Sequence, residues 1–215
     1  MKIDAAIFDL DGTLLDSMFV WEHLCERYLL SLGKTPSSDL NSTITTMTIL
    51  QACDYLNREY NLDSTPDRIA ELLQNTVKDF YFNEAQLKPE VKEFVSHLSS
   101  MGVKMCIATA SDRPYVEAAL KRCGIFDYFD KIFTCSEVGL SKQSPDIFNI
   151  ATEFLGADVS KTAVFEDAYF AAQTAKNLGY FVCGVYDATE PNADKLKEIA
   201  DLYIKDFSEA GAFFD

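Results

Sequence analysis

Two aspartates with the spacing of a catalytic pair, Asp9 and Asp11, stand at the end of an apolar run and directly before Gly12. Side chains at positions i and i+2 point to the same side of an extended backbone, so the two carboxylates repel each other unless a cation or a shared proton relieves them. Such a pair can divide the work of catalysis, because one carboxylate can attack an electrophile while the other donates and later accepts a proton. A turn after a strand also uses Asp and Gly, so other parts of the chain must decide between the two uses.

A calcium loop is another use of the pattern Asp-x-Asp-Gly. The EF-hand loop requires Gly at its sixth position and Glu at its twelfth. Counted from Asp9, these positions hold Leu14 and Val20. The sequence therefore excludes an EF-hand at this site.

The segments that must position the two aspartates alternate between strand and helix patterns. Strand-like apolar runs occupy residues 3–8, 103–109, 131–134, 162–165 and 180–186, with helical patterns between most of them. This alternation predicts a doubly wound α/β fold with a mostly parallel sheet, to which residues 201–204 add an edge strand. Ligands of such sheets bind just outside the carboxyl ends of the strands, where the aspartate pair is placed.

Three further short runs place polar residues at strand ends or helix starts. Thr109 ends the second strand-like run, and Lys142 precedes a helix in whose first turn we expect Pro145. Glu166 and Asp167 close the fourth strand-like run, directly before another helical pattern that starts near residue 168. Each run alone is a weak signal, but all of them fall where a parallel sheet gathers its functional residues.

Together with the run Asp-Leu-Asp-Gly-Thr at residues 9–13, these runs resemble, in order, the four motifs of the haloacid dehalogenase-like hydrolases. Most members of that family are magnesium-dependent phosphatases with a Rossmann-like α/β core. The resemblance extends from Ile3 to about Phe207, which is nearly the whole chain. It implies that this chain is a phosphoric monoester hydrolase.

The segment between the first and second motifs has a different pattern, which is helical throughout and shows no strand. Helical periodicity occupies residues 18–32, 43–60 and 66–82. Its position resembles the helical caps that many family members carry, which close over the site and exclude water. We therefore expect a discontinuous core of residues 1–15 and 88–215 and a cap of residues 16–87, with hinges at residues 14–17 and 86–89.

The resemblance assigns Asp9 as the nucleophile, which forms an aspartyl-phosphate intermediate. Asp11 protonates the departing alcohol and then activates water for the second step. Thr109 offers a hydroxyl, and Lys142 a positive charge, to the phosphoryl oxygens.

The expected cofactor is Mg²⁺, which prefers oxygen ligands in octahedral geometry. We expect its ligands to be Asp9, the main-chain carbonyl of Asp11, and Asp167, with Glu166 binding directly or through water. Lys142 would also relieve the repulsion among these carboxylates.

Other activities within the same family are less consistent with this sequence. Dehalogenases and phosphonate-cleaving members generally lack the acid two residues after the nucleophile, which is Asp11 here. The run Asp16-Ser17 and the spacing from Lys142 to Phe148 resemble the β-phosphoglucomutase-like branch, so a sugar-phosphate mutase is the main alternative.

That branch, however, has a His a few residues beyond the first motif, where this chain has Trp21, with His23 close by. The difference favours hydrolysis of a small phosphorylated metabolite, such as a sugar phosphate. A binding module without catalysis is a third hypothesis, but such a module would not need Asp11.

Composition limits the partners and the compartment. The chain has 215 residues and a net charge of −15, which argues against nucleic acid because phosphate backbones require clustered Lys and Arg. Its six cysteines show no C-x-x-C spacing and are expected to be reduced core residues of a cytoplasmic protein. We expect no signal peptide and no membrane span, and no pattern bears on the oligomeric state.

Overall fold

The computed structural model describes residues 2–44 and 47–214. The chain divides into two compact units. One consists of the chain up to Met18 and from Ala85 onward, and the other spans Phe19–Glu84. The first is called the core unit below and the second the helical unit, and each is described by itself.

The core unit contains a parallel sheet of six strands. The strands are β1 (Ala5–Phe8), β4 (Lys104–Thr109), β5 (Lys131–Thr134), β6 (Thr162–Glu166), β7 (Phe181–Val185) and β8 (Leu202–Ile204). They lie in the order β5-β4-β1-β6-β7-β8, so the first strand of the chain is central. Every pair is parallel, which confirms the predicted α/β sheet and the edge strand near residues 201–204.

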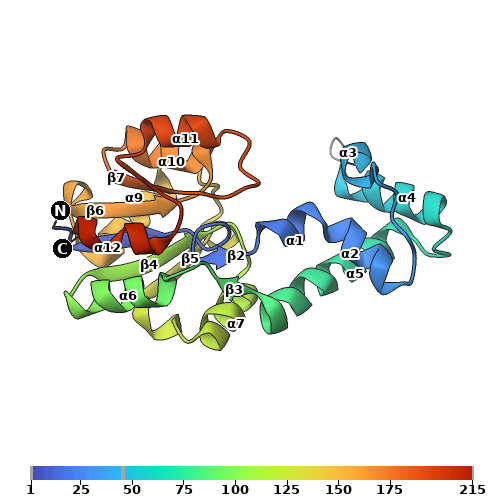
Figure 1. Cartoon of the computed structure of the whole chain (residues 1–215), viewed down its shortest axis with the longest axis horizontal. Coiled ribbons are helices and arrows are strands. Elements are labelled where there is room, and N and C mark those ends of the chain that lie inside the picture. The colour runs from blue at the N-terminus through green and yellow to red at the C-terminus, as the bar shows by residue number, and fades with distance from the viewer. Residues whose placement is uncertain (1, 45–46, 215) are drawn as a thin grey trace. The chain divides into compact units, whose positions relative to one another are not determined.

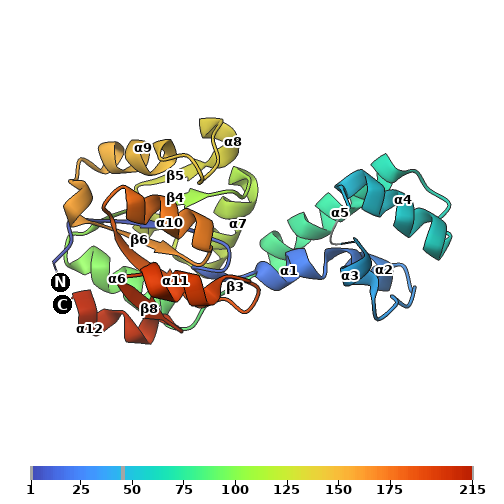
Figure 2. The same cartoon turned by 90° about the horizontal axis from the view of Figure 1, so that it is seen from above.

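Helices cover both faces of this sheet, as a doubly wound fold requires. They are α6 (Val91–Ser100), α7 (Arg113–Cys123), α8 (Cys135–Val138), α9 (Asp146–Leu155), α10 (Tyr169–Asn177), α11 (Ala193–Ile199) and α12 (Gly211–Phe214). Single 3₁₀ turns occur at η2 (Phe126–Tyr128), η3 (Val159–Lys161) and η4 (Phe207–Glu209). Figure 2 shows α9, α10 and α11 in succession across one face, and Figure 1 shows α6 and α7 on the other.

Alternate side chains of the strands pack against these two layers. Ile7 is buried in the same cluster as Ala151 and Ala172 of the α9 and α10 layer. Its neighbour Phe8 points the other way, stacks on Phe165 at 4.4 Å between ring centroids and meets Phe94 of α6 edge-on. The central strand is therefore buried on both faces, as its uninterrupted apolar sequence predicts.

Both connections between the units pass through a small antiparallel ribbon of the core unit that the sequence did not indicate. Its strands are β2 (Leu15–Asp16) and β3 (Gln86–Leu87). The carbonyl of Ala85 accepts a hydrogen bond from the Arg122 side chain of α7 and a second from the Cys123 thiol. The segments at residues 14–17 and 86–89, expected as hinges, are thus largely paired with each other and anchored to the core.

The helical unit forms an antiparallel packing of short helices. They are α1 (Met18–Glu22), which starts in the core unit, α2 (Leu24–Ser31), α3 (Leu40–Ile44), α4 (Ile49–Tyr60), α5 (Pro66–Asp79) and the π-helix η1 (Phe80–Glu84). Its own core joins apolar residues of α2, α4 and α5, among them Leu29, Leu56 and Leu73. The described part of this unit contains no strand, as the helical periodicity predicted.

Two of the predicted helices are interrupted. The helix expected at residues 18–32 breaks at His23, between α1 and α2. The one expected at residues 43–60 is two helices, because Thr48 caps α4 through a capping box with Gln51; residues 45 and 46 of that prediction lie outside the described residues.

Four of the six cysteines are buried, and the other two are partly exposed. Burial raises the pKa of all six thiols, that of Cys25 to about 11. Their burial and free state agree with the expectation of core thiols. Among residues 2–44 and 47–214, no helix combines the length and the apolar character that crossing a bilayer requires.

Candidate active site

Three carboxylates meet at the carboxyl edge of the sheet. Asp9 directly follows β1, and its backbone N–H donates to the Phe165 carbonyl of β6 at 2.9 Å. Because β1 and β6 are neighbouring parallel strands, Asp9 lies beside Glu166, the last residue of β6, and Asp167, which follows it. One carboxylate oxygen from each of the three residues lies within 4.8 Å of the others, and all three side chains are buried.

Lys142 supplies a positive charge to this group. It lies in the loop between α8 and α9, and its ammonium forms ion pairs with Asp9 and, at 2.9 Å, with Glu166. The side chain is only 4 % exposed. Burial lowers the pKa of Lys142, but the two carboxylates outweigh it and the net shift is upward, so the amine stays charged.

The four side chains together carry more negative charge than Lys142 balances. Burial raises the pKa of Glu166, which Lys142 opposes only in part. Burial and the charges of Asp9 and Glu166 raise the pKa of Asp167, whose Oδ1 accepts a hydrogen bond from Thr13 Oγ at 2.9 Å. Clustered carboxylate oxygens with uncompensated charge are the donor set that a divalent cation such as Mg²⁺ prefers, so these residues fit one.

Asp11 is held in a different way. Its Oδ1 accepts a hydrogen bond from Ser17 Oγ at 2.6 Å, and its Oδ2 accepts one from Ser111 Oγ at 2.5 Å. The backbone N–H of Ser111 donates to Thr109 Oγ at 3.0 Å, which links the end of β4 to Asp11. Hydroxyl donors on both oxygens fix the orientation of a half-buried carboxylate, as an acid and base of defined geometry requires.

Gly12 allows the turn to pass close to Asp167. Its φ is +76°, a conformation that only glycine adopts without strain. A methyl group built on Gly12 would overlap the Asp167 carboxylate. The glycine of the first motif therefore serves both the shape of the turn and the space for the acidic group.

We expect Gly12→Ala to lower turnover by about 10²-fold, because the Asp167 carboxylate must move away from the acidic group. Strain at positive φ should also cost about 1 kcal/mol of stability. Gly102→Ala is the matched control: Gly102 has φ +78°, and nothing lies within 4 Å of an added methyl group. Steady-state kinetics and thermal unfolding of both variants check this, and equal turnover in the two would contradict it.

The structure thus gathers the predicted site residues in two adjoining sets. Asp9, Lys142, Glu166 and Asp167 form the acidic group, while Asp11 and Thr109 are connected through Ser111. The sequence reasoning assigned no role to the hydroxyl groups of Thr13, Ser17 and Ser111. All of them stand within or directly beside the motifs, which is the signal that could have identified them. Pro145 precedes α9 as its N-cap instead of lying in its first turn.

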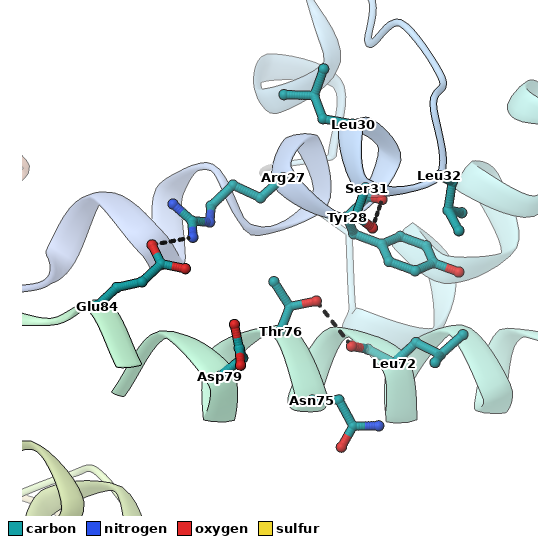
Figure 3. A pocket seen from close by; sticks show the side chains of 10 residues that line it. All are labelled: Arg27, Tyr28, Leu30, Ser31, Leu32, Leu72, Asn75, Thr76, Asp79 and Glu84. Carbon is teal, nitrogen blue, oxygen red and sulfur yellow. Dashed lines mark hydrogen bonds and ion pairs between the residues drawn. The ribbon is translucent and has the colours of Figure 1, made fainter. Parts of the chain in front are cut away.

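The helical unit contains a hollow of its own, between α2 and α5. It has a volume of about 540 Å³ and is lined in part by the exposed leucines Leu30 and Leu32. Figure 3 shows the ion pair of Arg27 with Glu84, 2.8 Å long, at one end of it. None of the predicted catalytic residues lines this hollow.

Sheet and site together define an α/β enzyme with a buried acidic centre at the strand ends. Residues 3–179 match the family model described as haloacid dehalogenase-like hydrolase. The match spans most of the chain, so the chain belongs to the haloacid dehalogenase-like hydrolase family, as the motifs indicated.

Curated relatives cover most of the chain at modest identity. A phosphorylated carbohydrates phosphatase of Thermotoga maritima is 24% identical over 82% of this chain and 82% of its own length. The fructose-1-phosphate phosphatase YqaB of Escherichia coli is 29% identical over 80% of this chain and 91% of its own. The crystal structure of CbbY from Rhodobacter sphaeroides in complex with phosphate shares the fold, with a TM-score of 0.71, 21% identity, and 97% and 96% of the two chains covered.

Proposed function

We propose that this hydrolase is a Mg²⁺-dependent phosphatase that removes the phosphoryl group from a small phosphorylated metabolite, such as a sugar phosphate. The observation that carries the proposal is the acidic group of Asp9, Glu166 and Asp167 around Lys142, directly beside an oriented Asp11. Relatives named as phosphatases of phosphorylated carbohydrates and of fructose-1-phosphate support the substrate class.

In the first step, an oxygen of Asp9 attacks phosphorus and the bond from phosphorus to the substrate oxygen breaks. Lys142 holds the attacking carboxylate in place and adds positive charge beside it. A bound Mg²⁺, with oxygen ligands from Asp9, Glu166, Asp167 and the main-chain carbonyl of Asp11, would neutralise the charge of the phosphoryl oxygens. Thr109 would donate its hydroxyl to one of these oxygens.

Asp11 would manage the protons of both steps. In its protonated form it delivers the proton to the departing alcohol oxygen, and as a carboxylate it then takes a proton from the water that attacks the phosphorus of the aspartyl-phosphate. This second attack releases inorganic phosphate and regenerates Asp9. Ser17 and Ser111 hold Asp11 in the orientation that both transfers need.

The helical unit, Phe19–Glu84, is proposed as the cap that selects the substrate. Its insertion between the first and second motifs supports this role. The boundaries expected from the sequence, residues 16–87, include the ribbon strand β3 and Asp16 of β2, which belong to the core unit. We therefore propose that the selecting segment is Phe19–Glu84 and that the ribbon belongs to the core.

We expect Asp11→Asn to lower kcat by about 10² to 10⁴-fold, because an amide cannot exchange the proton that both steps need. An activated substrate such as p-nitrophenyl phosphate needs less help with its leaving group, so its first step should be less affected than that of a sugar phosphate. Comparison of the two substrates in rapid-quench kinetics checks this. Equal losses on both substrates would contradict the assignment of leaving-group protonation to Asp11.

The proposed function is tested by phosphate release from a panel of sugar phosphates, nucleotides and p-nitrophenyl phosphate, with Mg²⁺ or with a chelator. Metal-dependent release is the expected result, and the panel ranks the substrates. Isomer interconversion of the same sugar phosphates, followed by NMR, tests the mutase alternative in parallel. Interconversion without phosphate release would overturn the phosphatase assignment.

A further inference from the structure

A buried ion pair lies in the core unit outside the acidic group. Lys88, which follows β3, and Asp187, which follows β7, are 8 % and 7 % exposed. The Lys88 ammonium lies 3.0 Å from Asp187 Oδ2 and donates to the Tyr186 carbonyl at 2.6 Å. The other carboxylate oxygen, Oδ1, accepts hydrogen bonds from the backbone N–H and the hydroxyl of Thr189. Both side chains thus take part in one buried hydrogen-bond network.

Lys88 joins three segments that are far apart in the sequence. Its backbone N–H donates to the Leu14 carbonyl at 2.9 Å, in the turn that follows Asp11. Its side chain reaches the loop after β7, and Glu190 of that loop accepts a hydrogen bond from the Tyr169 N–H at the start of α10. One residue therefore connects the turn of the first motif with the loop beside the helix that follows the fourth motif.

Stability alone does not account for a buried ion pair. Taking two charges out of water is costly, and well-packed apolar replacements of both partners are often neutral or stabilising. Such a pair does hold two chain segments together, because a buried ammonium must keep its oxygen partners within hydrogen-bond distance. Lys88 is also bonded to the turn at residues 10–15, through its backbone N–H and the Leu14 carbonyl, so the ion pair ties this turn to the loop after β7.

We propose that Lys88 is a positioning residue of the active site. Its ammonium binds Asp187 and Tyr186 and so holds the ribbon of β2 and β3 against the loop after β7. The turn that carries Asp11 is held in place together with the ribbon. The kinetic part of this inference rests on the proposed phosphatase function. Its structural part, the mobility of the turn, does not depend on any activity.

The test compares K88M, D187N and the double variant K88M/D187N with the wild type. K88M leaves an unpaired buried carboxylate and should lower Tm by roughly 10 °C. The double variant removes both charges and keeps an oxygen acceptor for Thr189, so its Tm should largely recover. K176M is the control for loss of an ion pair elsewhere in the same unit: Lys176 of α10 is partly exposed and pairs with Asp201, before β8, at 2.5 Å.

Two measurements are made on all variants, kcat and KM for phosphate release and amide hydrogen exchange of peptides covering residues 10–18. The proposal predicts that kcat falls about tenfold in K88M and stays low in the double variant, with KM changed less than about threefold. Exchange of the turn is faster in both, and K176M leaves kcat and turn exchange unchanged. Recovery of wild-type turn exchange and kcat in the double variant would overturn the proposal.

If the wild type releases no phosphate, the proposed function fails, and hydrogen exchange alone decides the role of Lys88. Faster amide exchange of the turn in the folded double variant than in the wild type then supports the positioning role. Equal exchange in the two proteins overturns it. If K88M does not fold, the double variant and D187N supply the same comparison.

Discussion

Asp9→Asn should lower kcat for phosphate release by at least about 10⁴-fold, because an amide oxygen cannot serve as the nucleophile that attacks phosphorus. The carboxylate is 8 % exposed and forms an ion pair with Lys142 at the edge of the sheet. The substitution changes little in volume, and it removes one of three clustered negative charges. We therefore expect the fold to persist while the chemistry stops.

Single-turnover phosphate release, with circular dichroism as a measure of folding, checks this expectation. Asp4→Asn is the matched control, because Asp4 is exposed just before the other end of β1 and bonds to Lys161 and Lys104 through its backbone, which the substitution leaves in place. Asp4→Asn should retain wild-type turnover. Turnover by Asp9→Asn within tenfold of the wild type would show that another group is the nucleophile.

The second large effect is expected on removal of the metal. A chelator should reduce phosphate release to background, at least about 10³-fold, and added Mg²⁺ should restore it. The physical reason is the surplus of buried negative charge at Asp9, Glu166 and Asp167, which Lys142 only partly balances. For the same reason, Mg²⁺ at 100 times its Kd should raise the free energy of unfolding by about 2.7 kcal/mol.

Thermal unfolding in MgCl₂ and in NaCl of equal ionic strength separates metal binding from screening. Asp167→Asn supplies the control, because it removes a buried charge and a metal ligand together. Without metal, this variant should be at least as stable as the wild type, and its response to Mg²⁺ should be much smaller. An equal response in the two proteins would mean that Asp167 does not hold the metal.

Much of the core could be predicted from the sequence because its determinants are local. Short apolar runs between helical patterns indicate strands buried on both faces, and all six predicted strands exist within a residue or two of their expected ends. Residues at the ends of parallel strands must meet at one edge of the sheet. The approach of Asp9, Glu166 and Asp167 follows from that rule once β1 and β6 are neighbours.

The helical insertion was predictable in kind but not in detail. Periodicity identifies an apolar face, but it does not show where a cap such as Thr48 ends one helix and starts the next. The two-residue strands β2 and β3 are too short to produce any alternation, so the sequence did not predict this ribbon of the core unit.

Sequence by itself determined the strands, the helical insertion and the motif residues of this hydrolase, because each depends on neighbours within one element. Only the tertiary structure decided that the hydroxyls of Ser17 and Ser111 bind Asp11 and that Lys88 pairs with Asp187. Lys88 and Asp187 are 99 residues apart, and nothing in either local pattern distinguishes a buried ion pair from two solvated charges. Their pairing depends on how the loop after β7 packs against the ribbon. Local sequence patterns cannot predict contacts between segments so far apart in the chain.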